Sequence, residues 1–507
     1  MATPLAAGRA PRLAIIGAGW TGLSAASRLL ETRGPGQTPE IHLFEAAPQV
    51  GGRARGLLWE DPQQRLCPAP IDNGQHLVLG AHQQTLLRLK SLGLLTGQWH
   101  SSPLAWQDHQ AGRQLWLNGQ TGWRQPLAAL LATIQGRHNP GRLGLAWPQD
   151  LWRLSRLLSQ STGSGPQAVD GLTTSELARQ QGWSQAFLNR LLIPLVEAML
   201  NTPFGEADAS VFLKTLREVL QGAPGASLCW HPAHNLTLDA LDPWVRSLTA
   251  QGVHLHLRHS VDALLPAAQG AQDAQGWQLS LRPAASTSST SSQVFDGLVV
   301  CCAPWHAADL VQDPLVQASL RLPPLAIATA WLWLDPAALS PWLQAQRRHP
   351  MALVPLSDAL SPGANDSRPA QSERVQAIGL LRPPGDWGQV ASLSFSALQD
   401  PDRPALEALA QRLFEDWLGP AARTGRRRLM IEKQATWSCD AQTVSRLALA
   451  RTSPQPQALR PGLFLASDAQ VPGLPATIES AVCSGQQAAD QMVDWLKRAG
   501  RGPERGS

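Results

Sequence analysis

The feature that most constrains the fold of this chain is a glycine-rich turn near its start. Apolar residues 13–16 form a short strand pattern, and Gly17, Gly19 and Gly22 follow in a Gly-x-Gly-x-x-Gly spacing ahead of an alanine- and leucine-rich helical stretch. A second apolar run ends at Glu45, 23 residues after Gly22. This order of strand, glycine turn, helix, strand and acid predicts the first βαβ unit of a dinucleotide-binding fold.

Each position in this unit suits a bound dinucleotide. Gly17 permits the tight turn, Gly19 lets the backbone approach a pyrophosphate, and Gly22 allows the helix to pack closely on the strand. The helix N-terminus adds positive potential at the same point. Glu45 is predicted to accept hydrogen bonds from a ribose, and its negative charge disfavours a cofactor with a 2′-phosphate.

Composition indicates a large protein without a nucleic-acid partner. The 507 residues are 43% hydrophobic and 16% charged, which predicts two or three lobes with substantial cores. The net charge of +4 is mild and comes partly from clusters such as 426–428. We interpret it as a solvated face or a weak attraction to anionic lipid. The six cysteines form no CxxC pair and no Cys/His cluster with metal-ligand spacing, so no metal site is expected.

The cysteines and the apolar segments predict a cytoplasmic location. Scattered thiols suit a reducing compartment, and the first twelve residues lack a separate apolar segment with a cleavage site. No apolar run approaches the length of a membrane span, and residues 325–334 read as a buried strand. The chain contains no tyrosine, which excludes a tyrosine acid or radical from any reaction.

Three further segments carry residues suited to binding or chemistry. In VGGRARG, residues 50–56, two glycines permit close backbone approach and Arg53 and Arg55 suit an anion. Residues 71–80 contain Asp72 and His76. Residues 462–492 read as a strand ending at Asp468, a Gly/Pro turn and a helix starting near residue 476. This last unit should fold back onto the first and point its helix N-terminus at the same ligand.

The middle of the chain predicts a second lobe. Residues 173–200 begin with a plausible helix cap and continue with apolar residues at helical spacing. Residues 254–265 alternate as one strand would.

Together the motifs GAGWTGL, FEA, VGGRARG, DNGQH and LPATIESAVCSG resemble those of FAD-dependent oxidoreductases of the amine oxidase and phytoene desaturase superfamily. The resemblance implies a mixed α/β (α+β) fold with a Rossmann-like FAD-binding domain built from discontinuous segments. These segments are residues 1–85, 225–310 and 430–507. An interleaved substrate domain of sheet plus helices would comprise residues 86–224 and 311–429.

The resemblance also implies the cofactor contacts. Gly52 would allow close approach to FAD, and Arg53 and Arg55 would neutralise its pyrophosphate. The remaining contacts implied are the backbone of Val261 at the adenine, Asp468 at the ribityl chain or pyrophosphate, and the backbone amides of Ala476, Thr477 and Ile478 at the N1/O2 edge of the flavin. Two positions depart from the family pattern, since Ser467 and Ala469 flank Asp468 where Gly and Trp are usual.

Within this superfamily, residues 71–94 and 473–485 are most similar to the hydroxysqualene dehydroxylases, or squalene-associated FAD-dependent desaturases, of bacterial hopanoid pathways. That similarity implies reductive removal of the hydroxyl group of hydroxysqualene to give squalene. It also implies a polyprenyl lipid substrate, peripheral contact with the inner membrane and contact with other enzymes of the squalene pathway. The candidates for the acid that protonates the leaving oxygen are His76, Asp72 and a bound water.

Other interpretations remain open. The same cofactor motifs suit a carotenoid desaturase of the phytoene type, or a flavin amine oxidase, although the usual aromatic cage with tyrosine is absent. Ser467 and Ala469 leave room for a flavin-free scaffold of a squalene-forming complex. Asp72 could also cap the turn at residues 73–74, and His76 could be a satisfied core histidine.

Overall fold

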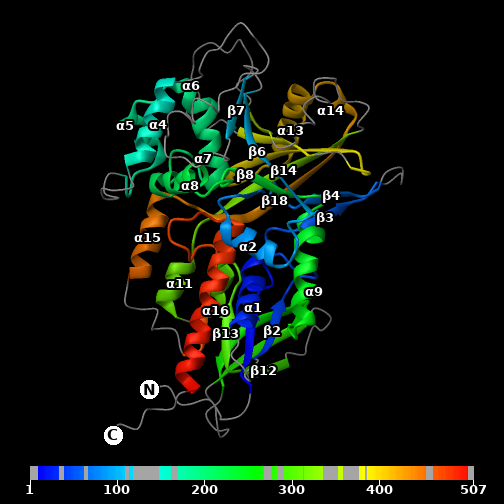
Figure 1. Cartoon of the computed structure of the whole chain (residues 1–507), viewed down its shortest axis with the longest axis vertical. Helices are drawn as coiled ribbons and strands as arrows, with labels where there is room; N and C mark the ends of the chain where they lie inside the picture. Colours follow the sequence, from blue (N-terminus) through cyan, green and yellow to red (C-terminus); the bar gives the residue numbers. More distant parts are fainter. Residues whose placement is uncertain are drawn as a thin grey trace.

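The computed structural model describes residues 10–32, 39–61, 67–108, 113–117, 148–160, 169–267, 276–283, 291–311, 313–334, 352–357, 376–382, 385–452 and 461–500. The described residues form two parts that are stacked in Figure 1. One part is built on a parallel sheet with the first and last long helices beside it. The other contains a large, mostly antiparallel sheet and most of the remaining helices. This confirms the mixed α/β fold class.

Among the described residues the parallel sheet has five strands in the order β19-β13-β1-β2-β9. Alternate residues of β1 serve two cores: Leu13 and Ile15 face one side, and Ala14 and Ile16 face the other. Burial on both faces explains the unbroken apolar run in the sequence. The strands are β1 (Arg12–Ile16), β2 (Glu40–Glu45), β9 (His254–Leu257), β13 (Gly297–Val300) and β19 (Leu463–Leu465).

Two layers cover this sheet. On one face pack the helices α1 (Trp20–Glu31), α2 (Gln83–Ser91), α9 (Asp242–Ala250) and α16 (Ile478–Gly500). On the other face lies an antiparallel sheet, with two short helices that also pack on this side. These elements are β10 (His259–Pro266), β11 (Trp277–Pro283), β12 (Ser291–Phe295), α10 (Pro304–Leu310) and α11 (Pro314–Leu320). The sheet is therefore the middle layer of a three-layer sandwich.

The second part is organised by a nine-stranded sheet of described strands, ordered β18-β14-β17-β16-β15-β6-β8-β5 with β7 paired to β6. Its strands are β5 (Val78–Leu79), β6 (Trp99–Asp108), β7 (Arg113–Leu117), β8 (Leu228–Pro232), β14 (Pro324–Leu334), β15 (Ala352–Ser357), β16 (Gln376–Leu381), β17 (Gln389–Leu398) and β18 (Arg426–Trp437). A hairpin of β3 (Gly56–Trp59) and β4 (Ala69–Asp72) lies between the two parts in Figure 1. Strands β5, β8 and most of β18 belong to this sheet although they lie within the segments predicted for the cofactor domain, 1–85, 225–310 and 430–507. The domain boundaries stay a prediction.

Helices cover the second sheet in two groups. A bundle with its own apolar core contains α4 (Pro148–Gln160), α5 (Thr174–Gln181), α6 (Gln185–Phe187), η2 (Leu188–Leu192), α7 (Ile193–Leu200) and α8 (Ala209–Gln221), with α15 (Ala441–Thr452) against it. The helices α13 (Arg403–Leu418) and α14 (Ala421–Thr424) pack with β14, β16 and β17. The strand predicted at residues 325–334 is confirmed as the buried β14.

The helical stretch predicted at residues 173–200 is interrupted. Thr173 caps α5 in a reciprocal capping box with Glu176, as the sequence suggested. Gly182 then ends α5 in the left-handed conformation, with φ +62°, and the Ser184 side chain caps the next helical segment. The apolar spacing continues across this break, which is why periodicity alone did not show it.

The single strand predicted at residues 254–265 is wrong. Two strands occupy this stretch, with β9 in the parallel sheet and β10 in the antiparallel sheet. Arg258 separates them with φ +58°, in a region that turns the chain and that few residues other than glycine adopt. Alternation of apolar residues persists through this turn and so concealed it.

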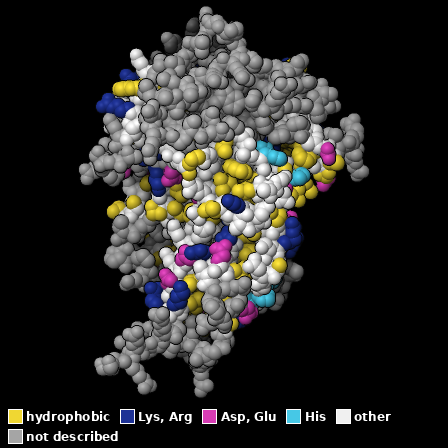
Figure 2. All heavy atoms as spheres, viewed as in Figure 1, with side chains coloured by type: hydrophobic (Ala, Val, Ile, Leu, Met, Phe, Trp, Pro, Cys, Tyr) yellow, Lys and Arg dark blue, Asp and Glu magenta, His cyan; other side chains and the backbone are white. Residues whose placement is uncertain are grey.

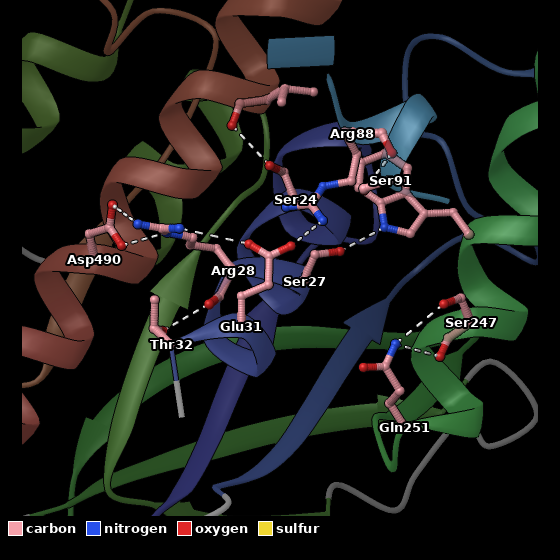
Figure 3. A network of polar contacts seen from close by, with 12 residues as sticks. Ser24, Ser27, Arg28, Glu31, Thr32, Arg88, Ser91, Ser247, Gln251 and Asp490 are labelled. Carbon is pink, nitrogen blue, oxygen red and sulfur yellow. Dashed lines mark hydrogen bonds and ion pairs between the residues drawn. The ribbon is translucent and has the colours of Figure 1, made fainter. Parts of the chain in front are cut away.

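Polar contacts tie α1 to three other helices. Arg28 pairs with Asp490 of α16, with Nε 2.7 Å from Oδ1, while Glu31 pairs with Arg28 and with Arg88 of α2 (Figure 3). The Nε1–H of Trp244 in α9 donates to the hydroxyl of Ser27 at 2.8 Å, and both residues are buried. The ion pairs of Arg28 are half-exposed and contribute little. The indole N–H of Trp244 is buried, so losing its acceptor would destabilise the fold.

We expect Ser27→Ala to lower the free energy of unfolding by about 1–3 kcal/mol, because it leaves the buried Trp244 N–H without its acceptor. Ser247→Ala on the outer side of α9 is the control and should change it by less than about 0.5 kcal/mol. Thermal and urea unfolding of the purified variants measure both. Equal changes in the free energy of unfolding from the two substitutions would show that the Trp244–Ser27 hydrogen bond does not stabilise the fold.

Candidate functional site

The glycine turn is packed so tightly that side chains are excluded from it. A Cβ on Gly22 would lie 1.9 Å from the carbonyl oxygen of Gly17. Gly17 has φ +103°, and its added Cβ would lie 3.0 Å from the carbonyl oxygen of Cys301 at the end of β13. The turn therefore brings β1, α1 and β13 together at backbone distance, as the spacing predicted.

The start of α1 suits an anion. Gly19 is its extended N-cap and provides no side-chain cap, and the first turn contains no acidic residue. The first backbone N–H groups of a helix lack partners within the helix, and the helix dipole adds positive potential there. A phosphate at this end would supply the missing acceptors.

Glu45 lies at the mouth of the turn. Its carboxylate accepts hydrogen bonds from the backbone N–H of Ala18, at 2.8 Å, and of Ala47, at 2.9 Å. These bonds orient the acid at the carboxyl end of β2, beside the glycine turn. Its contact with a ribose stays a prediction.

The segment that contains Gly51 and Gly52 crosses the glycine turn. The N–H of Gly51 donates to the carbonyl of Ala18 at 2.9 Å, and Gly51 bridges to Gly19. Gly51 has φ +106°, and a Cβ there would lie 2.4 Å from Cδ1 of Leu241. Gly52 has φ +58° and is exposed, with only Gly19 near its missing Cβ. Backbone thus forms an open cradle at Gly19 and Gly52, which a side chain at either position would begin to fill.

Arg53 joins two of the sequence motifs. Its Nη2 lies 2.8 Å from Oδ1 of Asp468, its Nη1 donates to the carbonyl of Ala435 at 2.9 Å, and its guanidinium stacks over Trp305 at 5.4 Å from the ring centroid. Asp468 is buried, so this ion pair holds the 50–56 segment against the strand β19 region. The guanidinium of Arg55 instead donates to the carbonyl of Gly52. Phosphate contact by either arginine stays a prediction.

The start of α16 is capped by its own side chains. The N–H of Ser480 donates to the hydroxyl of Thr477 at 3.1 Å, and the N–H of Thr477 donates to the hydroxyl of Ser480 at 2.9 Å. Ala476 packs on the helical bundle and Ile478 on the core of the parallel sheet, so this start lies between the two parts. Because the Thr477 amide already has an acceptor, the neighbouring amides at 476 and 478 are the stronger candidates for flavin contact.

The two departures from the family pattern are accommodated internally. The hydroxyl of Ser467 accepts from the N–H of Ala469 at 3.3 Å, and the N–H of Ser467 donates to the hydroxyl of Ser484 at 2.9 Å. Both Ser467 and Ala469 are buried, the latter in the core of the helical bundle. The extra hydroxyl thus serves the loop around Asp468.

Val261 lies on β10, where its backbone pairs with Leu281 next to a register shift. Its side chain packs against the core on the β10–β12 side of the parallel sheet. A bulge leaves part of the local ladder unpaired, which suits a backbone contact with an adenine. That contact stays a prediction.

Asn73 connects the glycine-arginine motif to the segment with Asp72 and His76. Its Oδ1 accepts from the N–H of Arg55 at 3.0 Å and lies 3.0 Å from Nε2 of His76, while its Nδ2 donates to the carbonyl of Arg53 at 3.0 Å. One amide side chain therefore holds both segments in a common geometry. The sequence indicated only a turn at this position.

A pocket opens beside Asn73, where β4, β8, β14 and β16 meet. Polar groups and apolar walls contribute to it: Asp72, His76, His231, Trp331, Leu380 and Arg382 line it. Both candidate catalytic residues of the sequence analysis thus face one cavity. His231 and Arg382 were missed because each lies in an ordinary strand segment without a recognisable motif.

Asp72 is a carboxyl group that is protonated far more easily than usual. Burial raises its pKa to about 6, against the opposing charge of Arg382 and a hydrogen bond from the N–H of Leu236 at 2.9 Å. At neutral pH about a tenth of such groups carry a proton. Asp72 can therefore act as an acid in this pocket, in addition to its role as acceptor for the backbone at residue 236.

The two histidines of the pocket are neutral. Burial and the charge of Arg55 together lower the pKa of His76 to about 4, and burial lowers the pKa of His231 to about 4. With Nε2 of His76 directed at the Asn73 oxygen, that nitrogen is the donor and Nδ1 is unprotonated. His76 is thus a positioning group and a poor acid.

Arg382 supplies the positive charge beside Asp72. Its Nη1 donates to the carbonyl of Pro70 at 2.9 Å and its Nη2 donates to the carbonyl of His234. Burial lowers its pKa while Asp72 and Asp239 raise it, and the guanidinium stays charged. Two carbonyl acceptors hold it in place whether Asp72 is charged or neutral.

These features define a dinucleotide-binding protein with a backbone cradle for a pyrophosphate and an acid-containing pocket next to it. Residues 20–493 match the family of flavin-containing amine oxidoreductases. The chain therefore belongs to that family and is an FAD-dependent oxidoreductase.

Two curated relatives indicate which members of the family this chain resembles. The chain is similar to a hydroxysqualene dehydroxylase of Rhodopseudomonas palustris, at 26% identity over 494 residues, covering 94% of this chain and 97% of the relative. It is similar to a hydroxysqualene dehydroxylase of Zymomonas mobilis at 24% identity over 489 residues, with the same coverage. These matches support the subfamily resemblance seen in the motifs.

Solved structures share the fold. Cyclohexylamine oxidase from Brevibacterium oxydans superposes with a TM-score of 0.63 at 15% identity, covering 97% of this chain and all of the other (100%). An oxidoreductase from Methanosarcina mazei gives a TM-score of 0.62 at 14% identity, covering 94% of this chain and 100% of the other. At this identity the likeness shows the fold alone.

The chain fits FAD at the positions that the structure brings together. The uncapped start of α1, the open cradle at Gly19 and Gly52, and the acid Glu45 beside the turn suit a pyrophosphate and a ribose. Bound there, FAD supplies two-electron redox chemistry that no side chain offers.

We expect Gly52→Ala to weaken FAD binding at least about 10-fold, because the new Cβ enters the cradle. Gly93→Ala is a matched control, since Gly93 also has positive φ, +72°, but nothing lies within 4 Å of its missing Cβ. Both variants carry the same kind of backbone strain. Flavin absorbance per protein and fluorescence titration of the apoprotein would measure the difference, and equal losses would argue against the cradle.

Proposed function

We propose that the protein catalyses the reductive dehydroxylation of hydroxysqualene to squalene. The observation that carries this proposal is the acid-containing pocket joined through Asn73 to the cofactor segment, in a chain similar to hydroxysqualene dehydroxylases over 94% of its length. A dehydroxylation needs a proton for the leaving oxygen and a hydride for the carbon. The pocket contains a candidate proton donor, and Asn73 connects it to the segment that would hold the cofactor.

One turnover balances with a proton and with a hydride from the reduced cofactor. The C–O bond of the substrate breaks, the oxygen takes a proton in addition to its own and leaves as water, and the carbon gains a hydride. FAD bound in its reduced state would supply that hydride, which amounts to two electrons and one proton. A separate donor must then reduce the cofactor for the next turnover.

Asp72 is the residue that we assign as the acid. Protonation of the hydroxyl converts a poor leaving group into water, and a carboxyl group with a pKa of about 6 transfers a proton readily near neutral pH. Neutral His76 and charged Arg382 then hold the geometry of the pocket. Trp331 and Leu380 give this pocket apolar walls.

We expect Asp72→Asn to lower kcat/KM by about 10²–10⁴-fold. In the parent enzyme kcat/KM should fall as the pH rises through about 6, since the protonated carboxyl is the active form. This dependence should vanish in Asp72→Asn. Asp262→Asn, at a half-exposed position on β10, is the matched control and should keep the parent profile. If kcat/KM of Asp72→Asn still falls as the pH rises through about 6, Asp72 is not the acid.

A product assay tests the reaction itself. Purified protein with photoreduced FAD is incubated with hydroxysqualene without oxygen, and the extracted lipids are analysed by mass spectrometry. Squalene together with reoxidised flavin is the expected result. Unchanged hydroxysqualene in the presence of bound, reduced flavin would refute the proposal and favour desaturation of a carotenoid precursor, to be tried next under oxidising conditions.

A polyprenyl substrate dissolves in membranes, so we also propose peripheral membrane contact, which would bring the chain near other enzymes of squalene formation. Within the described residues no helix is both long and apolar enough to cross a bilayer. Apolar side chains gather across the middle of the face seen in Figure 2. Leu58 of β3 and Leu238 of η3 (Thr237–Leu241) are 51% and 40% exposed, and hydrogen bonds between Gly56 and Thr237 keep their elements adjacent.

We expect the double variant Leu58→Glu/Leu238→Glu to bind less to vesicles of phosphatidylglycerol and phosphatidylcholine, because charges resist entry into the bilayer interface. Leu265→Glu, at a comparably exposed site on β10, serves as the control. Co-sedimentation measures the bound fraction. A parent protein that stays entirely in the supernatant would contradict the membrane proposal and leave the dehydroxylase proposal to the product assay.

A further inference from the structure

A second cluster of reactive side chains lies at the edge of the parallel sheet. Glu40 and His42 are two residues apart on β2, so they share a face of the strand. His254 on β9 is the direct register partner of His42. The patterns Glu-x-His and His-x-His on neighbouring strands therefore converge on one patch, although they lie more than 200 residues apart in the sequence.

The ligand atoms of this patch are close enough to share one ion. One side-chain nitrogen or oxygen from each of Glu40, His42 and His254 lies within 4.8 Å of the others. Nε2 of His42 is 2.7 Å from Oε1 of Glu40. A tetrahedral zinc ion with bonds of about 2.0–2.1 Å separates neighbouring ligand atoms by about 3.3 Å, which a small shift of the half-exposed Glu40 side chain provides.

His256 orients the ring of His42. Nδ1 of His42 lies 3.0 Å from Nε2 of His256, and the two rings are stacked at an interplanar angle of 3°. Metal-bound histidines commonly donate their other ring N–H to such an acceptor, which selects the tautomer and the ring orientation. His42 is itself buried, so its position is determined by packing against Phe44 and Phe295.

The charges around the patch permit a cation. Nε of Arg12 lies 3.1 Å from Oε2 of Glu40 and leaves Oε1 to His42. His259 also stands near, with its ring centroid 5.7 Å from that of His256. Neutral imidazoles and one carboxylate are the ligands that zinc-class ions prefer.

We propose that Glu40, His42 and His254 form a binding site for a divalent transition-metal ion of the zinc class, which clamps the edge strand β9 onto β2. His42 would bind the ion through Nε2, with its ring proton on Nδ1 directed at Nε2 of His256. Glu40 and His254 are exposed, and a water completes the fourth position. The linear sequence gave no metal-ligand spacing because the pairing of two strands creates the site.

This site is distinct from the flavin cradle. Glu40 begins β2 and Glu45 ends it, and five residues of strand span about 16–17 Å. The metal therefore acts on the register and stability of the sheet edge and has no part in the redox chemistry.

The test uses the FAD-loaded full-length protein after treatment with a chelator. Titration with Co²⁺, followed by its visible absorbance, and with Zn²⁺ by calorimetry should give one ion bound per chain. Loss of a residue that hydrogen-bonds to a metal ligand lowers metal affinity about 10–100-fold. The variant His254→Gln removes a ligand itself, so it should lower the affinity for the ion at least about 100-fold. It should also abolish the rise of the unfolding midpoint with Zn²⁺.

His306→Gln removes an exposed histidine on α10 and is the matched control, with an expected affinity equal to the parent's. Binding of less than one equivalent, or an affinity unaffected by His254→Gln, would overturn the proposal. Glu40, His42 and His256 would then form a plain hydrogen-bonded relay. Because flavin content and squalene formation are read separately, failure of this site would leave the proposed reaction untouched.

Discussion

The structure depends on backbone-to-backbone packing at the glycine turn. Gly22 leaves no room for a Cβ beside the Gly17 carbonyl, and Gly17 meets the end of β13. On α16, a Cβ at Gly485 would lie 2.2 Å from the carbonyl oxygen of Thr21, so α1 and α16 also cross at backbone distance. Glycine is the only residue that lets such contacts form. Segments from the start, middle and end of the chain are thereby brought to one point, where an anion at the N-terminus of α1 completes the arrangement.

From that point a short chain of polar contacts reaches the pocket. Arg53 holds the buried Asp468, and Asn73 binds the backbone of Arg53 and Arg55 together with the ring of His76. Each bond is worth only about 1 kcal/mol, but together they give the cofactor segment and the pocket a common geometry. The position of the pocket relative to the cofactor segment is therefore determined by the polar contacts of Arg53, Asp468 and Asn73.

Burial then assigns the chemical roles within the pocket. The same low-dielectric surroundings raise the pKa of Asp72 to about 6 and lower that of His76 to about 4. The carboxyl group becomes the better proton donor and the imidazole becomes neutral, the reverse of their behaviour in water. At the far end of β2, burial likewise lowers the pKa of His42 and of His256.

The sequence by itself determined the dinucleotide-binding unit, the cofactor class and the cap of α5, because each is encoded by residues a few positions apart whose spacing has one physical meaning. Glu45, the adjacent glycines and the long last helix were found in the same way. Only the tertiary structure decided that Arg258 divides two strands, that Asp72 and His76 line one pocket, and that Arg382 and His231 share that pocket. Those properties arise from burial and from contacts between segments up to several hundred residues apart, and no local pattern records them.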